Sequence, residues 1–232
     1  MHRKVSILIL ALFLLVETAG AQSIHQSLAF VAREKASSYS DITWEHNCDA
    51  LGDAQIAVGS ATVTYDAGIL LNESDQTQGT GCFDSNDDDY DEIKFNQSGN
   101  FSYTNSRIGF HFNPQELSTG RMIEMTGDLS ITFTSGTYVY ASYRGSGNQL
   151  IDLGVSTSTW YYIELEFNNT VMTVYVNDVE KGNATGSDAW TSTTITFFAP
   201  PGRTAWDYLL DRMRISNDHT RDLYAIKDIN IS

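Results

Sequence analysis

Apolar and polar side chains alternate along residues 160–177, and this alternation limits what the chain can fold into more than any other feature. The alternation is interrupted once, by the Asn-rich stretch Asn168-Asn169-Thr170. Because successive side chains of a strand point to opposite faces, the pattern predicts two strands joined by a tight turn, a β-hairpin with one buried face. The side chains predicted to be buried are Tyr161, Ile163, Leu165 and Phe167 in the first strand and Met172, Val174 and Val176 in the second.

Period-two patterns continue through most of the chain after residue 54, and helical periodicity is nearly absent there. Clusters of Gly, Asn, Asp and Ser separate the candidate strands. Many short strands without strand–helix–strand alternation predict an all-β fold, an antiparallel two-sheet sandwich. The other candidate strands are 55–65, 68–71, 92–95, 106–112, 122–125, 129–134, 138–143, 149–154, 193–199 and 208–215.

The first 21 residues have the three parts of a secretion signal. Arg3 and Lys4 precede an apolar run over residues 5–16, and Ala19 and Ala21 fit the small-residue cleavage pattern. The run is shorter than the roughly 20 residues that span a bilayer. We therefore expect residues 1–21 to be a cleaved signal peptide, with a secreted or cell-surface product and no membrane insertion after cleavage. An uncleaved anchor helix is the alternative.

The remainder is predicted to hold one domain, because Pro is scarce and no low-complexity linker interrupts the chain. Residues 22–50 are assigned to an N-terminal arm or a short helix packing on the domain, and residues 51–232 to the sandwich. The formal net charge of −15 makes nucleic acid and anionic lipid poor partners.

Four short segments resemble the laminin-G-like domains of the concanavalin A-like superfamily. They are Trp160 with the strand Val174-Tyr175-Val176-Asn177-Asp178, the segment 210–217, the segment 88–93, and the segment 106–114. The resemblance implies a jelly roll with one concave sheet, which binds glycans or proteins on a sheet face or rim, often with calcium. Arg212 departs from the family, which often has an acid there, and residues 22–67 lie outside the main resemblance.

An acidic segment offers a candidate calcium site. Calcium takes six to eight oxygen ligands, and oxygen-bearing side chains recur here at near-alternate positions. The segment is not an EF-hand loop, because Phe95 stands at its twelfth position. A solvated acidic loop is the alternative. The candidate ligands are Asp84, Asn86, Asp88, Asp89 and Asp91.

Aromatic side chains in the second half of the chain are candidates for stacking on sugar rings, with core or rim packing as the alternative. Tyr138 and Tyr140 are two apart and would share one face of a strand. The full candidate set is Tyr138, Tyr140, Trp190, Trp206 and Tyr208.

Two acidic residues raise the possibility of glycoside hydrolysis. Glu164 and Glu166 would share one strand face, as paired catalytic carboxylates can. Glycanases of the resembling fold often carry a third acid in this row, where this chain has Asn168. A polar solvent-facing row is the favoured interpretation, and we predict no catalytic residues.

Secretion would permit a disulfide between Cys48 and Cys82, with two free thiols as the alternative. Six N-x-Ser/Thr sequons suggest a glycosylating host. The acceptors are Asn72, Asn96, Asn100, Asn168, Asn183 and Asn230.

Three functions are therefore weighed. The leading one is a secreted, non-catalytic binding or adhesion module for extracellular glycan or glycoprotein, with calcium as its candidate cofactor. The second is a structural subunit of a surface layer, appendage or virion coat, which would require self-association. The third is a glycoside hydrolase on the same fold. Fold alone does not decide among them.

Overall fold

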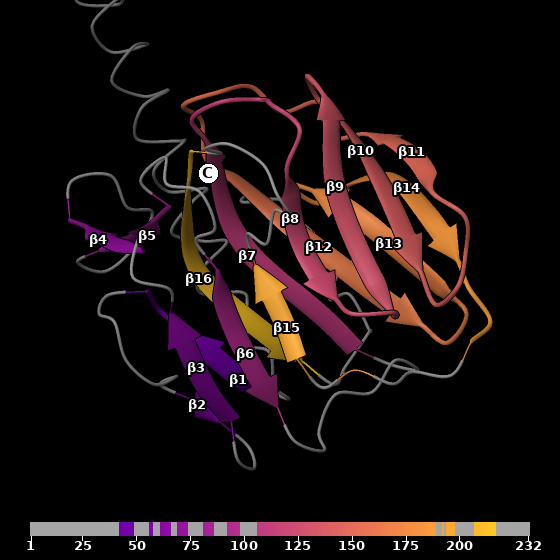
Figure 1. Cartoon of the computed structure of the whole chain (residues 1–232), viewed down its shortest axis with the longest axis horizontal. Coiled ribbons are helices and arrows are strands. Elements are labelled where there is room, and N and C mark those ends of the chain that lie inside the picture. Colours follow the sequence, from indigo (N-terminus) through magenta and orange to yellow (C-terminus); the bar gives the residue numbers. More distant parts are fainter. Residues whose placement is uncertain are drawn as a thin grey trace, which may run out of the picture. The chain divides into compact units, whose positions relative to one another are not determined.

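The described strands form two antiparallel β-sheets, as the alternation predicts (Figure 1). The computed structural model describes residues 42–48, 56–57, 61–65, 69–73, 81–85, 92–97, 106–188, 192, 194–197 and 207–216. All of them belong to one unit, Asp41–Thr220. The all-β, two-sheet prediction is confirmed. The predicted signal peptide lies outside the described residues.

The first sheet, sheet A, is built around two long central strands that lie side by side, β7 (Ser106–Pro114) and β16 (Tyr208–Ser216). On the far side of β7 the order continues through β12 (Tyr161–Asn168) and β13 (Val171–Val176) to β14 (Val179–Thr185). On the far side of β16 lie β1 (Ile42–His46), β2 (Ile56–Ala57), β5 (Cys82–Asp84) and β4 (Leu70–Asn72).

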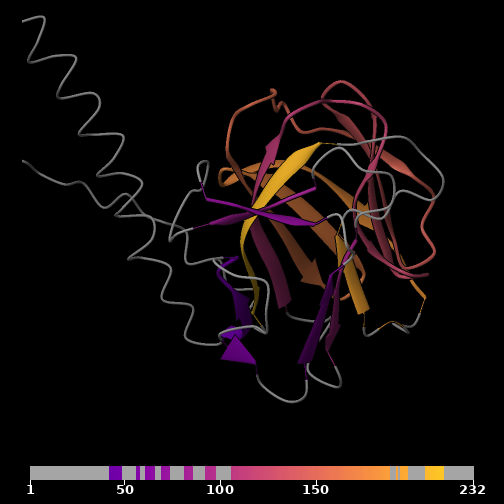
Figure 2. The ribbon, with the colours of Figure 1, turned by 60° about the vertical axis from the view of Figure 1, so that its left-hand side comes forward.

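The second sheet, sheet B, has seven described strands, and both layers can be followed in Figure 2. Its order is β11 (Gln149–Asp152), β10 (Tyr138–Tyr143), β9 (Leu129–Ser135), β8 (Arg121–Met125), β15 (Thr194–Phe197), β6 (Ile93–Gln97) and β3 (Ala61–Tyr65).

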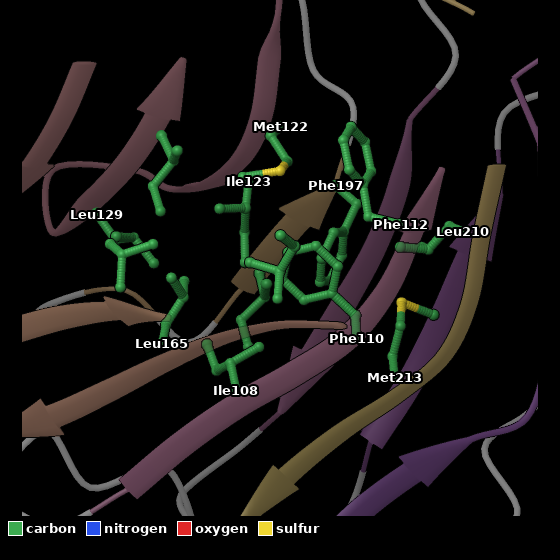
Figure 3. Packing of buried hydrophobic residues seen from close by; sticks show 14 of the residues in the cluster. Ile108, Phe110, Phe112, Met122, Ile123, Leu129, Leu165, Phe197, Leu210 and Met213 are labelled. Atoms are coloured by element: carbon green, nitrogen blue, oxygen red, sulfur yellow. The ribbon is translucent and has the colours of Figure 1, made fainter. Parts of the chain in front are cut away.

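The core lies between the sheets and is filled by the inward side chains of both (Figure 3). Phe110 of β7 meets Phe197 of β15 edge to face, with ring centroids 5.0 Å apart. Phe112 stacks on Phe133 of β9 at 6.0 Å. Such ring pairs add about 0.5–1.5 kcal/mol beyond the burial of their area. The β7 rings therefore tie the two layers together.

The predicted hairpin is present as β12 and β13. Leu165 faces Val174, and Phe167 faces Met172 across the ladder. All four side chains are fully buried. Asn169 occupies the turn with φ 53°, a conformation that Asn tolerates better than most residues.

Three of the described strands were not predicted from the sequence: β1, β5 and β14. β1 lies within the segment assigned to the arm, yet it pairs with β16 from Ile42 to His46. The sandwich therefore begins before residue 51. In the part of the chain that the structure describes, no helix is long and apolar enough to cross a bilayer.

The predicted disulfide is not formed in the structure, although Cys48 and Cys82 are both fully buried. Cys48 belongs to the core cluster. The ring of Phe83 points into that core, 5.1 Å from the ring of His46. Because neighbouring side chains of a strand point to opposite faces, the Cys82 side chain leaves β5 on the face opposite to Phe83.

Candidate functional site

Two tyrosines project from the outer face of sheet B. Tyr138 and Tyr140 of β10 are 45% and 43% exposed, whereas Val139 and Ala141 between and beside them are fully buried. Two residues along a strand span about 7 Å, so the two rings form a short row on one face. The prediction that they share a face is confirmed. Their binding role is untested.

The strands on either side complete this surface. On β11, Leu150 stands opposite Tyr140 and Asp152 stands opposite Tyr138. On β9, Thr132 stands opposite Tyr140. Leu150 is 59% exposed, the largest value among the exposed apolar side chains of the described residues. We call Thr132, Tyr138, Tyr140, Leu150 and Asp152 the tyrosine face. It combines apolar rings with a hydroxyl and a carboxylate, as sugar-binding surfaces do.

The carboxylate of Asp152 is held in place by its neighbours. The Thr137 hydroxyl donates a hydrogen bond to Oδ1 (2.5 Å), and the Gly154 backbone N–H donates to the same oxygen (3.0 Å). These bonds, chiefly that from Thr137, with a smaller effect of the Lys181 charge, lower the pKa of Asp152. Asp152 therefore carries a fixed negative charge beside Tyr138 at neutral pH.

The cation nearest in the strand order is already engaged. Arg121 of β8 stands opposite Thr132, and its Nη1 contacts the Glu124 carboxylate. Lys181 of β14 lies by Gly154, where its Nζ is 3.2 Å from the position that a Cβ would take. No cation stands among the five residues of the tyrosine face.

The outer face of sheet A differs, because several of its charged side chains are buried. Arg107 and Glu164 lie on neighbouring strands, with Arg107 Nη1 3.9 Å from Glu164 Oε2, and their residues are 7% and 3% exposed. On the same face, Glu45 Oε1 accepts from Arg214 Nη2 at 3.2 Å and from Arg212 Nε at 3.3 Å. We call Glu45, Arg107, Glu164, Asp211 and Arg214 the buried charge row.

Tyr162 packs tightly within this outer face of sheet A. Its ring lies 5.2 Å from that of His111, and its hydroxyl fills the space above Gly109, where a Cβ would meet it at 2.1 Å. Sequence alternation placed Tyr162 and Glu164 on one face, but it gave no sign that the face would be closed to solvent.

This burial bears on the carboxylate pair. Glu164 is engaged by Arg107 and is almost fully buried. Asn168, at the third position of the row, is exposed at the end of β12. The Glu164 carboxylate is therefore closed to solvent and paired with Arg107, whereas a glycoside-cleaving acid must reach the sugar and its catalytic partner.

The prediction that Tyr208 stacks on a ligand is wrong. It is 1% exposed, and its ring packs on Phe112 at 5.7 Å. Its strand, β16, lies in the middle of sheet A, so its inward side chains enter the core. Trp190 and Trp206 lie outside the described residues.

Of the proposed calcium ligands the structure describes only Asp84, whose Oδ2 accepts from Asn72 Nδ2 at 3.1 Å. The described residues contain no cluster of His, Cys, Asp or Glu that could hold a metal. Asn86, Asp88, Asp89 and Asp91 are outside that part of the chain, so the calcium prediction is untested.

The described sequons differ in accessibility. Asn96, Asn168 and Asn183 are exposed, whereas Asn72 is half-buried and its amide is engaged by Asp84. Asn100 and Asn230 lie outside the described residues.

Comparison with known proteins identifies the fold. No protein-family model matches the sequence, and no curated protein matches it either. Solved structures do match. The binding domain of botulinum neurotoxin serotype D has 14% sequence identity and a TM-score of 0.62, over 77% of this chain and 49% of that one. The receptor-binding domain of botulinum neurotoxin type G has 14% identity and a TM-score of 0.59, over 77% of this chain and 48% of that one. A third is the serotype D ligand-binding domain in complex with N-acetylneuraminic acid, with 16% identity and a TM-score of 0.62, over 79% of this chain and 49% of that one.

At these identities the likeness shows a shared β-sandwich fold. The chain spans about half the length of the structures that it matches.

Proposed function

We propose that this chain is a secreted, non-catalytic binding module that takes an extracellular glycan on the tyrosine face. The observation that carries the proposal is the exposure of Tyr138 and Tyr140 on one face of β10. Both rings face solvent, although burial of an aromatic ring is favourable. The proposal includes a jelly roll of the concanavalin A-like, laminin-G-like type, which the segments quoted above support.

The chemistry of the surface favours a glycan over a protein partner. A stable protein interface buries about 800 Å² on each side, with an apolar centre. The tyrosine face offers three exposed apolar side chains, Tyr138, Tyr140 and Leu150, bordered by hydroxyl and carboxylate groups. Flat rings suit the C–H faces of sugars, and the polar border suits their hydroxyls.

The neurotoxin structures support the proposal at the level of fold, since one is a receptor-binding domain and another is a ligand-binding domain in complex with N-acetylneuraminic acid.

The test is retention of the purified chain on an array of polysaccharides and glycoprotein glycans. We expect the wild type to be retained, and Tyr138→Ala and Tyr140→Ala each to weaken binding about tenfold. Val179→Ala is the matched control, because Val179 is 58% exposed but lies on β14 of sheet A. Unchanged retention of the Tyr138→Ala/Tyr140→Ala double variant would remove the tyrosine face from the binding site.

The same array, run with and without a calcium chelator, tests the proposed calcium dependence of binding. Light scattering over a range of concentrations tests self-association. If Tyr140→Ala abolishes self-association and no glycan is retained, then the tyrosine face is a contact between copies of the chain.

A further inference from the structure

We infer that the tyrosine face selects neutral glycans over glycans carrying carboxylate or sulfate groups. The inference rests on the proposed function and adds the ligand class to it. It distinguishes this chain from the neighbour that was solved with N-acetylneuraminic acid, a sugar acid.

The first argument is the position of Asp152. Its residue pairs with Tyr138 across the β10–β11 ladder, and directly opposed side chains of a sheet have Cβ atoms about 5 Å apart. A sugar lying on the Tyr138 ring would therefore meet this carboxylate. Thr137 and Gly154 hold Oδ1, which fixes the charge in place.

The second argument is that the described part of the chain places no compensating cation on the tyrosine face. Recognition of a carboxylate or sulfate usually uses an Arg fork or a Lys ammonium group. Arg121 is two strands away from Tyr140, or about 10 Å, and it is paired with Glu124. Among the described residues, Lys181 is also near this face, and its charge acts on Asp152 itself.

The third argument is the charge of the whole chain. A net charge of −15 lowers the local concentration of anionic ligands around the molecule. Neutral sugars are unaffected by this field. The local carboxylate and the global charge therefore act in the same direction.

The experiment measures the affinity of the full chain for matched pairs of oligosaccharides by titration calorimetry. One pair is lactose with its sialylated form, and a second pair is an oligomannan with an oligomannuronate. We expect the neutral member of each pair to bind more tightly. Two charges about 7 Å apart in water change an affinity about two- to threefold.

Asp152→Asn should reduce the ratio of the affinity for the neutral member to the affinity for the anionic member by about threefold. The reason is that the amide keeps an acceptor for Thr137 and Gly154 but loses the charge. Glu73→Gln is the control for net charge, since Glu73 is exposed and lies beside β4, on the other sheet. Raising the salt concentration should narrow the ratio for the wild type and have less effect on Asp152→Asn.

The selectivity would be overturned if the anionic members bound as tightly as the neutral ones or more tightly. If that binding were lost in Tyr140→Ala, the proposed function would still hold. Binding that survives the Tyr138→Ala/Tyr140→Ala double variant would overturn the function itself. An unchanged ratio in Asp152→Asn would show that Asp152 is not the source of the selectivity.

Discussion

The two outer faces of the sandwich are built from the same alternating pattern, yet they have opposite exposures. Sheet A places Arg107, Glu164 and Arg214 outward and buries them. Sheet B places Tyr138 and Tyr140 outward and leaves them in solvent. Polarity would predict the reverse, because charged groups are costly to bury and aromatic rings gain from burial.

This inversion separates two roles. Within the buried charge row, Arg107 pairs with Glu164 and Arg214 pairs with Glu45, so these four residues bear on stability. The rings of the tyrosine face have no such ion-pair partners, so we expect variants there to change the proposed ligand binding more than stability. Variants on the two faces should therefore have different consequences, and three comparisons test this difference.

The largest effect is expected from removing one member of a buried ion pair. Glu164→Ala leaves the Arg107 guanidinium buried without its carboxylate and should lower the free energy of unfolding by about 3 kcal/mol. Glu124→Ala on sheet B also breaks an Arg–Glu pair, but both side chains are more exposed, so the loss should stay below about 1 kcal/mol. Chemical denaturation measures both. Equal losses would show that the two faces do not differ in this respect.

A smaller effect is expected from crowding the outer face of sheet A. Gly109→Ala places a methyl group where the Tyr162 hydroxyl lies and should cost about 1–3 kcal/mol. Gly147→Ala, in the loop after β10, meets no atom within 4 Å and should change stability by less than about 0.5 kcal/mol. Thermal unfolding of the two variants checks this. A stable Gly109→Ala protein would mean that Tyr162 moves away at little cost.

The smallest effect concerns the pH dependence of Asp152. Its pKa is lowered in the folded chain, so the ionised form is favoured by folding. The resulting stabilisation is present above the ordinary carboxyl range and is lost as the pH falls through the folded pKa. We expect Asp152→Asn to lower the unfolding temperature slightly at pH 7, and the difference to vanish once the pH is well below the lowered pKa of Asp152. A difference that grows on acidification would contradict the lowered pKa.

Strand alternation was sufficient to predict most of sheet B and the β12–β13 hairpin. It failed for β14, because Val179–Thr185 contains few apolar residues and lies at the edge of its sheet. It failed for β1 and β5 because short strands are defined by the backbone of β16, a partner distant in sequence. Hydrogen bonding to a remote strand leaves no local pattern to detect.

The candidate site was predicted in part for a similar reason. Period two places Tyr138 and Tyr140 on one face, but it does not say which face of a strand will be covered. Tyr208 was chosen on the same grounds and is buried, because β16 has neighbours on both sides and the second sheet over it. The buried charge row could not be predicted, since its closure depends on packing across strands.

The position of β16 also governs when the molecule can acquire its structure. The strand β16 is synthesised after every other described strand, yet it lies between β7 and the early strands β1 and β5. During translation, β1 and β5 therefore lack their pairing strand until β16 has been synthesised. Sheet A is therefore completed only after all of the described strands have been synthesised, and a chain that still lacks β16 leaves the edges of β1, β5 and β7 that face it unpaired.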